Sequence, residues 1–291
     1  ITTVSIAAQL ATFPLGMYYF HQFPNYFFLS NLFVIPLATF IINGGVLLFV
    51  ISSIPVLPNY IAWAVNKMLV FLNFAVEWVD SLPYSLTLGI SISTLETLLI
   101  YLIILLFIPS VISKNFKGIK MALSCAILLV FFQFYEKITL QEQQYFIVYD
   151  VKGERAIDFV DGNKNYFIAD DDLAKDKSKM RFHIMHYRWE RRVQESSLVP
   201  SIYTSNNYFR NKNFIQFYDK NILLLDKDFI KAKNLSEIKF DFVIVSGKAE
   251  VDLENINCKQ LIIDSSVSYY KQEQIKKECH KRDIPFYNVN T

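Results

Sequence analysis

The sequence predicts a polytopic α-helical membrane domain over residues 1–139, followed by a soluble α+β domain over residues 140–291. Three observations support this prediction. Residues 1–139 are almost continuously apolar and hold only five lysines and four acidic residues, whereas every other charge lies beyond them. After residue 143 the apolar pattern changes to the short runs and turns of β-strands. The hydrophobic content of 53% is high for a soluble protein.

Five apolar segments are candidates for membrane-spanning helices, because a spanning helix needs about 20 mainly apolar residues. They are Thr3–Phe20, Phe27–Ile51, Asn59–Leu82, Thr94–Ile112 and Gly118–Ile138. Backbone polar groups inside a bilayer must be paired within the protein, so we expect helices rather than open strands. The first domain is therefore predicted to have four or five spans.

A lysine-rich loop predicts the orientation of these helices. Lys114, Lys117 and Lys120 lie between the fourth and fifth candidates, and the other short loops hold essentially no lysine or arginine. The positive-inside rule places this loop in the cytoplasm. Residues 140–291 are then extracytoplasmic, and Ile1 is cytoplasmic if all five candidates span.

Polar side chains recur along the third candidate helix. Asn59, Asn66, Asn73 and Asp80 are spaced by seven residues, and with Glu77 they share an arc of roughly 60° on one helix face. Such residues are costly in hydrocarbon and often line a watery path. Two other interpretations stay open: an amphipathic helix lying on the membrane surface, and hydrogen bonding between packed helices.

The second candidate helix holds further polar residues near a proline. Asn31 and Asn43 flank Pro36, which removes a backbone donor and predicts a kink or a break in the helix. A broken helix at membrane depth is tolerated where it lines a cavity. Asn31 and Asn43 are therefore added to the candidate pore-lining residues, with an ordinary proline kink as the alternative.

The segment before the fourth candidate is predicted to be extended. Residues 81–93 alternate leucine and isoleucine with small or polar residues, and Ser93 and Glu96 have the spacing of a helix capping box. Glu96 is thus interpreted as a helix cap and not as a functional carboxylate.

A long ordered pattern lies at the start of the chain. Residues 7–36 read AAQLATFPLGMYYFHQFPNYFFLSNLFVIP, with an aromatic-rich turn around His21–Phe27, then Ser30-Asn31-Leu32 and Ile35-Pro36. This pattern resembles the ComEC family, the competence proteins that carry transforming DNA across the inner membrane. The resemblance covers about residues 3–107 and continues more loosely to the C-terminus.

The resemblance implies a location, a substrate and partners. It implies a multi-pass protein of the bacterial inner membrane, with single-stranded DNA as substrate. It also implies a DNA-receptor protein outside and a helicase-like motor inside. The chain starts at Ile1 without an initiator methionine, so we expect a missing N-terminal part of the same protein to complete the channel.

The second half reads as short strands, turns and a late helix. The expected strands are Tyr145–Val151, Ala156–Val160, Asn165–Ala169, Phe214–Tyr218, Ile222–Leu225, Phe242–Ser246, Gln260–Ile263 and Ile284–Val289. The expected helix is Ser268–Asp283, and the polar residues 171–192 are expected to form a surface helix or loop. By resemblance, this is a reduced metallo-β-lactamase-like domain.

The sequence predicts no catalysis and no cofactor in this domain. The compact His-x-His-x-Asp-His motif that holds the metals of that superfamily is missing. His183 and His186 are three residues apart but lack a neighbouring carboxylate base and a third ligand at a diagnostic spacing. The cluster Asp264-Ser265-Ser266 is interpreted as the N-cap of the late helix.

Two further features of this domain concern cysteines and arginines. Cys258 and Cys279 could form a disulfide if the domain lies outside the cytoplasm. A basic run with interspersed aromatic residues could contact DNA, with a solvated charged face as the alternative. Its arginines are Arg181, Arg188, Arg191 and Arg192.

The leading functional hypothesis is a part of an inner-membrane channel for single-stranded DNA. The first alternative is a membrane-anchored hydrolase or nuclease, which metal content and a nuclease assay would reveal. The second is a small-solute transporter with an outer sensing domain, which competition between DNA and small solutes would reveal.

Overall fold

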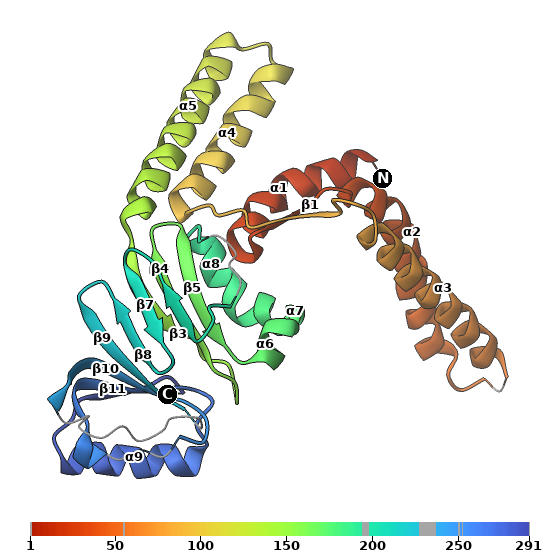
Figure 1. Cartoon of the computed structure of the whole chain (residues 1–291). Helices are drawn as coiled ribbons and strands as arrows, with labels where there is room; N and C mark the ends of the chain where they lie inside the picture. Colours follow the sequence, from red (N-terminus) through yellow and green to blue (C-terminus); the bar gives the residue numbers. More distant parts are fainter. Residues whose placement is uncertain are drawn as a thin grey trace. The chain divides into compact units, whose positions relative to one another are not determined.

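The computed structural model describes residues 2–54, 56–193, 198–226, 237–249, 251 and 253–290. The chain forms two compact units, Ile1–Gln133 and Phe134–Thr291 (Figure 1). The first unit is helical apart from one short strand pair, and the second contains two sheets with helices. The predicted fold class, apolar helices followed by a mixed α/β domain, is confirmed.

All five predicted helices of the first half form. They are α1 (Thr2–Phe20), α2 (Phe27–Ile51), α3 (Leu57–Asp80), α4 (Thr94–Ile112) and α5 (Phe116–Thr139). Within the described residues, three helical segments are long and apolar enough to span a membrane: Phe27–Ile51, Thr94–Ile112 and Phe116–Glu142. Helices α1 and α3 are not among these three, so length and composition support three of the five expected spans. The cytoplasmic position expected for Ile1 requires all five candidates to span the membrane. Ile1 itself lies outside the described residues.

The aromatic-rich turn between α1 and α2 is tied to the segment before α4. Strand β1 (Gln22–Pro24) pairs antiparallel with β2 (Leu86–Leu88), as an extended segment at 81–93 predicts. Asn25 Nδ2 donates to the carbonyl of Tyr84 at 2.7 Å, and the hydroxyl of Tyr26 donates to the carbonyl of Pro83 at 3.0 Å. This turn is therefore hydrogen-bonded to the segment before α4, which lies about 60 residues later in the sequence.

The start of α4 has the predicted capping box. The backbone N–H of Ser93 donates to Glu96 Oε2 at 2.7 Å, and the N–H of Glu96 donates to Ser93 Oγ at 3.3 Å. The helix start is thus satisfied by its own first turn. In contrast, α2 continues past Pro36 as one helix, so of the predicted kink or break the break does not occur.

Helices α2 and α3 form an antiparallel hairpin, visible at the right of Figure 1. Gly44 on α2 makes their close approach possible, because a Cβ atom there would lie 2.6 Å from Cγ2 of Val65 on α3. The neighbouring Gly45 has nothing within 4 Å of an added Cβ. The two adjacent glycines thus have different roles.

Gly44→Ala is expected to destabilise the α2–α3 hairpin by about 1–3 kcal/mol, the usual cost of overpacking. Gly45→Ala is the matched control and should be neutral or slightly stabilising, because alanine favours helix more than glycine does. Denaturant unfolding of the two variants in detergent measures the difference. Equal stabilities would show that Val65 does not limit the approach of the helices.

The second unit begins with a three-stranded antiparallel sheet. Its strands are β3 (Gln144–Val148), β4 (Ala156–Asp161) and β5 (Lys164–Ala169), in the order β3-β4-β5. The sheet is followed by the short helices α6 (Asp171–Lys175), α7 (Lys177–Met180), η2 (Arg181–Met185, a π-helix) and α8 (His186–Glu190).

The second sheet has seven strands in the order β12-β11-β10-β9-β8-β7-β6. They are β6 (Ile202–Thr204), β7 (Tyr208–Asn211), β8 (Phe214–Phe217), β9 (Lys220–Leu225), β10 (Lys239–Val245), β11 (Asn257–Ile263) and β12 (Phe286–Asn288). Strands β6 to β9 form an antiparallel meander, and β9 to β12 run parallel. Helix α9 (Tyr269–Lys281) connects β11 to β12.

These elements form four layers (Figure 1). One buried cluster joins the two sheets face to face and includes Phe159 of β4 and Leu224 of β9. A second cluster places Ile275 and Cys279 of α9 against the outer face of the parallel strands. A third places Leu173 and the helices after β5 against the first sheet. The segment 171–192 is therefore partly core, and not only a surface segment as predicted.

Candidate functional site

The polar residues of α3 all lie on its exposed side. Asn59, Asn66, Asn73, Glu77 and Asp80 are exposed, and we call them the α3 polar stripe. The buried residues Ala75 and Val79 lie on the opposite side of the helix. The α3 polar stripe thus points away from the contact with α2, and packing within the α2–α3 hairpin does not account for it.

The two asparagines of α2 differ from the stripe and from each other. Asn43 is exposed, and its Nδ2 donates to the backbone carbonyl of Thr39 at 2.9 Å, one turn earlier in the same helix. Asn31 is half-buried near the start of the helix. Their role as pore-lining residues stays a prediction.

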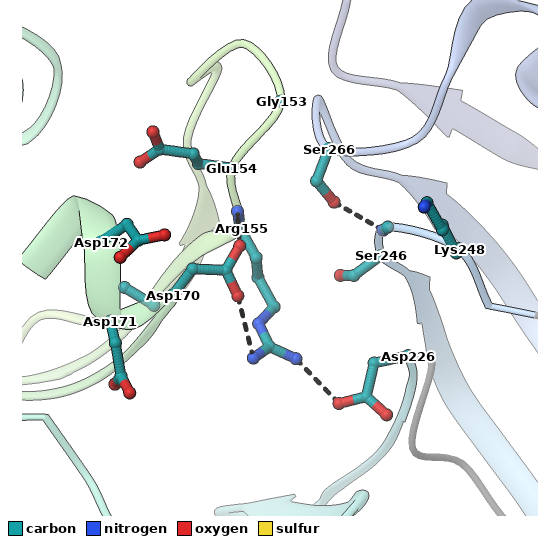
Figure 2. A pocket seen from close by; sticks show the side chains of 12 residues that line it. Gly153, Glu154, Arg155, Asp170, Asp171, Asp172, Asp226, Ser246, Lys248 and Ser266 are labelled. Atoms are coloured by element: carbon teal, nitrogen blue, oxygen red, sulfur yellow. Dashed lines mark hydrogen bonds and ion pairs between the residues drawn. The ribbon is translucent and has the colours of Figure 1, made fainter.

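A cavity of about 750 Å³ lies in the C-terminal unit at the carboxyl ends of the parallel strands (Figure 2). Asp226 follows β9, Ser246 follows β10 and Ser266 follows β11. The hairpin loop with Arg155 and the segment after β5 form the other wall. The carboxyl ends of parallel strands are the usual place for a ligand in such sheets.

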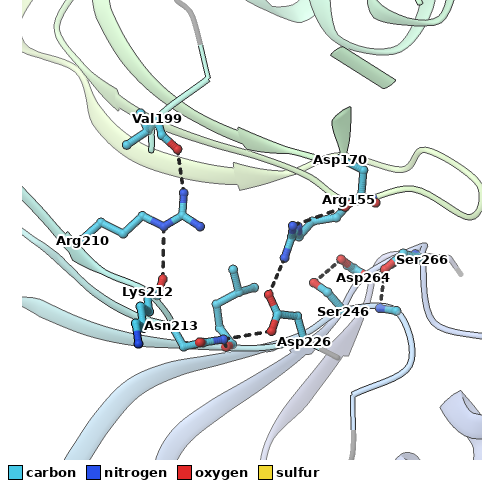
Figure 3. Close-up of polar contacts among 12 residues, drawn as sticks. Arg155, Asp170, Val199, Arg210, Lys212, Asn213, Asp226, Ser246, Asp264 and Ser266 are labelled. Atoms are coloured by element: carbon cyan, nitrogen blue, oxygen red, sulfur yellow. Dashed lines mark hydrogen bonds and ion pairs between the residues drawn. The ribbon is translucent and has the colours of Figure 1, made fainter. Parts of the chain in front are cut away.

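Arg155 connects the two sheets across this cavity. Its guanidinium donates to Asp226 Oδ2 at 2.8 Å and lies 3.3 Å from Asp170 Oδ1 (Figure 2). The other oxygen of Asp226 accepts from Asn213 Nδ2 at 3.1 Å (Figure 3). Arg155 is thus committed to protein carboxylates, and its charge is not free for an anionic ligand.

Asp264 is the buried acid of this edge. It is 1% exposed and accepts from Ser246 Oγ at 2.5 Å, from the N–H of Ser266 at 2.9 Å, and from Ser266 Oγ (Figure 3). Burial raises the pKa of its carboxyl above the ordinary value, and the hydrogen bonds from the two serines oppose that shift.

The serines after β11 bridge loops and do not cap α9. Ser265 Oγ donates to Asp150 Oδ1 at 2.6 Å, and Ser266 Oγ accepts from the N–H of Gly247 at 2.6 Å. The N-cap residue of α9 is Ser268, whose side chain makes no capping bond. The predicted N-cap role of the Asp264 cluster is therefore wrong, because these side chains bond to neighbouring loops instead.

The raised pKa of Asp264 predicts a pH-dependent contribution to stability. A folded pKa above the ordinary value of 3.8 stabilises the fold fully below that value, and the contribution is lost as pH rises through the folded pKa. Asp264→Asn should therefore gain stability relative to the native protein as pH rises from about 4. Denaturant unfolding across pH 4–8 checks this.

Asp241→Asn is the control with the opposite sign. The pKa of Asp241 is lowered by the Lys259 ammonium and by the N–H of Asn221, so its contribution is present above the ordinary value and lost as pH falls. Asp241→Asn should lose stability relative to the native protein as pH rises. If the stabilities of the two variants changed with pH in the same direction, the raised pKa assigned to Asp264 would be contradicted.

The cavity is predominantly acidic. Its charged lining consists of five carboxylates, from Glu154, Asp170, Asp171, Asp172 and Asp226, against two cations, Arg155 and Lys248. Such a lining repels the phosphates of a nucleic acid. In the part of the chain that the structure describes, no group of three or more histidine, cysteine or acidic side chains is placed to hold a metal ion.

The predicted basic run is not one surface. Arg188 is 1% exposed, and its Nε and Nη2 donate to Asp158 at 2.7 and 2.8 Å. Its guanidinium also stacks 4.3 Å from the ring centre of Phe167. The prediction that Arg188 contacts DNA is therefore wrong, because this side chain neutralises a buried carboxylate.

The other three arginines are nearer the surface. Arg181 is exposed in η2, Arg191 lies 5.7 Å from the ring centre of Tyr187, and Arg192 donates to Glu136 at 2.7 Å. DNA contact by these three residues stays a prediction.

The two histidines near α8 and the two cysteines of the C-terminal unit were candidates for metal binding and for a disulfide. His183 and His186 are both exposed. Cys258 and Cys279 are free thiols; Cys279 lies in the core cluster between α9 and the parallel strands, and Cys258 packs against that cluster. A disulfide between them is not formed in this structure.

Taken together, span-length apolar helices and an α/β unit with a polar strand edge define an integral membrane protein with a folded extramembrane domain. Comparison with protein families identifies which one. The competence protein model matches residues 1–117, and the ComEC C-terminal domain model matches residues 146–291. The chain belongs to the ComEC family. Comparisons with curated proteins and with solved structures gave no match, so the likeness to metallo-β-lactamases stays a prediction.

Proposed function

We propose that this chain is part of an inner-membrane channel that carries single-stranded transforming DNA into the cytoplasm. The observation that carries the proposal is the α3 polar stripe, exposed on a helix within the region that matches the competence protein family. A conduit for a polyanion has to be polar and wet but poor in fixed cations, so that the strand can leave again. The carboxamides of Asn59, Asn66 and Asn73 meet that requirement.

The two acidic residues of the α3 polar stripe do not fit the narrow part of a DNA path. Glu77 and Asp80 lie in the last turn of α3 and would repel phosphates in a narrow passage. We therefore assign them to a mouth of the path, where water screens their charge. Asn31 and Asn43 on α2 belong to the same proposed lining.

The C-terminal unit is proposed to be non-catalytic. The polar groups at its strand edge are engaged in ion pairs of Arg155 and in the hydroxyl–carboxylate contacts of Asp264. The acidic lining disfavours a phosphodiester substrate. The described residues that line the cavity include no histidine to serve as a general base.

The family and the lysine loop support the proposed location and partners. Lys114, Lys117 and Lys120 support a cytoplasmic α4–α5 turn by the positive-inside rule, and residues 140–291 are then proposed to be extracytoplasmic. The proposed partners are a DNA-receptor protein outside and a helicase-like motor inside, together with an N-terminal part of the same protein.

Transformation frequency in a deletion strain tests the proposed function. Deletion of the gene should abolish transformation, and the intact gene supplied in trans should restore it. Wild-type transformation in the deletion strain would overturn the proposal and favour a small-solute transporter. Solute uptake measured with and without competing DNA then separates these two functions.

A nuclease assay tests the non-catalytic assignment separately. The purified full-length protein should leave labelled single- and double-stranded DNA intact with Mg²⁺, Mn²⁺ or Zn²⁺ added. Metal-dependent cleavage that co-purifies with the protein would instead support the membrane-anchored hydrolase.

A further inference from the structure

We infer that the exposed face of α9 is a binding site for single-stranded DNA, on which bases stack against Tyr269 and Tyr270 and phosphates contact Lys277 and Lys281. This inference rests on the proposed function, because it assumes that DNA reaches the C-terminal unit. It assigns DNA contact to a surface different from the arginine run at 181–192.

The two tyrosines form an exposed aromatic pair. Tyr269 is 76% exposed and Tyr270 is 75% exposed, and they are the first two residues of α9. Consecutive helical side chains diverge by about 100°, so the two rings present separate faces to solvent. Exposed aromatic rings are the stacking platforms on which single-stranded nucleic acids bind without base specificity.

The lysines continue the same helix face. Gln272, Ile275 and Cys279 are buried against the sheet. Away from them, Tyr270, Lys277 and Lys281 follow the i, i+7, i+11 spacing of a single line along the helix. Both lysines are exposed, so the line has an aromatic end and a cationic end.

Two cations next to these lysines form ion pairs. Lys276 contacts Glu273 at 2.9 Å, and Arg282 contacts Glu254 at 2.6 Å. Within the described residues, the structure shows no ion pair for Lys277 or Lys281. Lysines four residues apart on a helix are about 6 Å apart at Cβ, which suits contact with neighbouring phosphates of an extended strand.

The first turn of α9 lies beside the rim of the acidic cavity. Lys271 Nζ donates to the carbonyl of Lys248, and Lys248 lines that cavity. The carboxylates of the cavity repel phosphates and the α9 lysines attract them, so the charges favour the helix face as the DNA contact. An anionic membrane surface is less favoured, because the line holds no aliphatic or tryptophan side chain to insert among lipids.

Binding of a fluorescein-labelled oligothymidine to the full-length protein in neutral detergent tests the inference. Tyr269→Ala with Tyr270→Ala should weaken binding by about tenfold or more, and Tyr269→Phe with Tyr270→Phe should bind like the native protein, because stacking needs the ring and not the hydroxyl. Tyr287→Ala is the matched control, since Tyr287 is a 56% exposed tyrosine on β12. Thermal unfolding of each variant checks that the fold is intact.

Salt dependence tests the lysines. Lys277→Gln with Lys281→Gln should reduce the slope of log K against log salt concentration by roughly 1.4, the value for two lost phosphate contacts. Binding that is unchanged in the alanine and glutamine variants, or absent in the native protein, would overturn the inference. So would loss of binding to anionic vesicles in the glutamine variant with unchanged DNA binding.

The inference and the proposed function fail in different ways. A deletion strain that transforms normally removes the proposed function. A deletion strain that fails to transform, but is fully restored by the double alanine variant, leaves the proposed function intact and removes α9 as the contact that uptake needs.

Discussion

Replacing Arg188 with methionine is expected to destabilise the C-terminal unit by about 3–5 kcal/mol, the cost of leaving one partner of a buried ion pair unpaired. The side chains of Arg188 and Asp158 are 2% and 0% exposed. Asp158 also accepts hydrogen bonds from the hydroxyl of Tyr149 and from Asn165 Nδ2, both at 2.8 Å. These two neutral donors do not replace the lost charge. Denaturant unfolding of the full-length variant measures the effect.

Arg191→Met is the matched control for this prediction. Arg191 is exposed and lies one residue after α8, so its replacement should change stability by less than about 1 kcal/mol. Replacing Arg188 and Asp158 together with apolar residues should be less damaging than Arg188→Met alone, because no charge is left buried. An Arg188→Met variant with native stability and impaired DNA binding would restore the surface role that the sequence suggested.

Replacing Asn66 and Asn73 together with leucine is expected to lower transformation toward the level of the deletion strain. The two carboxamides lie at the centre of the α3 polar stripe and are exposed. Leucine has a similar volume but cannot bond to water, so a hydrated path would be interrupted at two successive positions. Leucine also favours helix and lipid, so membrane insertion should not fall.

The control for this variant is a pair of apolar changes on the adjacent face of α3. Trp63 and Phe74 are each 63% exposed, and Trp63→Leu with Phe74→Leu removes no carboxamide and no charge. This control should transform normally at equal membrane levels of protein. If the asparagine variant also transforms normally, the α3 polar stripe lies at the membrane surface or packs against another helix and does not line the path.

Local patterns predicted most of the secondary structure. Apolar runs bounded by turn residues located β4, β5 and β8 to β12 to within a few residues, and the Ser93–Glu96 spacing gave the cap of α4. Strands β6 and β7 were missed. They are three and four residues long, and the side chains of β6 stay exposed, so no buried run marks them in the sequence.

The contacts of the candidate sites were less predictable, because they join residues far apart in sequence. Arg155 and Asp226 are 71 positions apart, and Arg188 and Asp158 are 30 apart. One signal for the second pair was present: Asp158 interrupts an otherwise apolar strand, and a buried carboxylate needs a polar or cationic partner. The sequence offered no way to choose Arg188 as that cation among the four arginines nearby.

The polar stripe was found from sequence because helical periodicity alone defines it. Seven-residue spacing places its members on one face, and the exposure of all five agrees with that placement. What covers that face depends on tertiary contacts and on the membrane, and helical periodicity carries no information about either.

Delivery of labelled DNA to the cytosol tests the central claim most directly. Competent cells with and without the gene are given end-labelled duplex DNA, and the label in single strands is measured in the cytosolic fraction. We expect cytosolic single strands in the native strain, and in the deletion strain label that is bound to the cells but absent from the cytosol. Equal cytosolic label in both strains would contradict the claim that this protein forms part of the path.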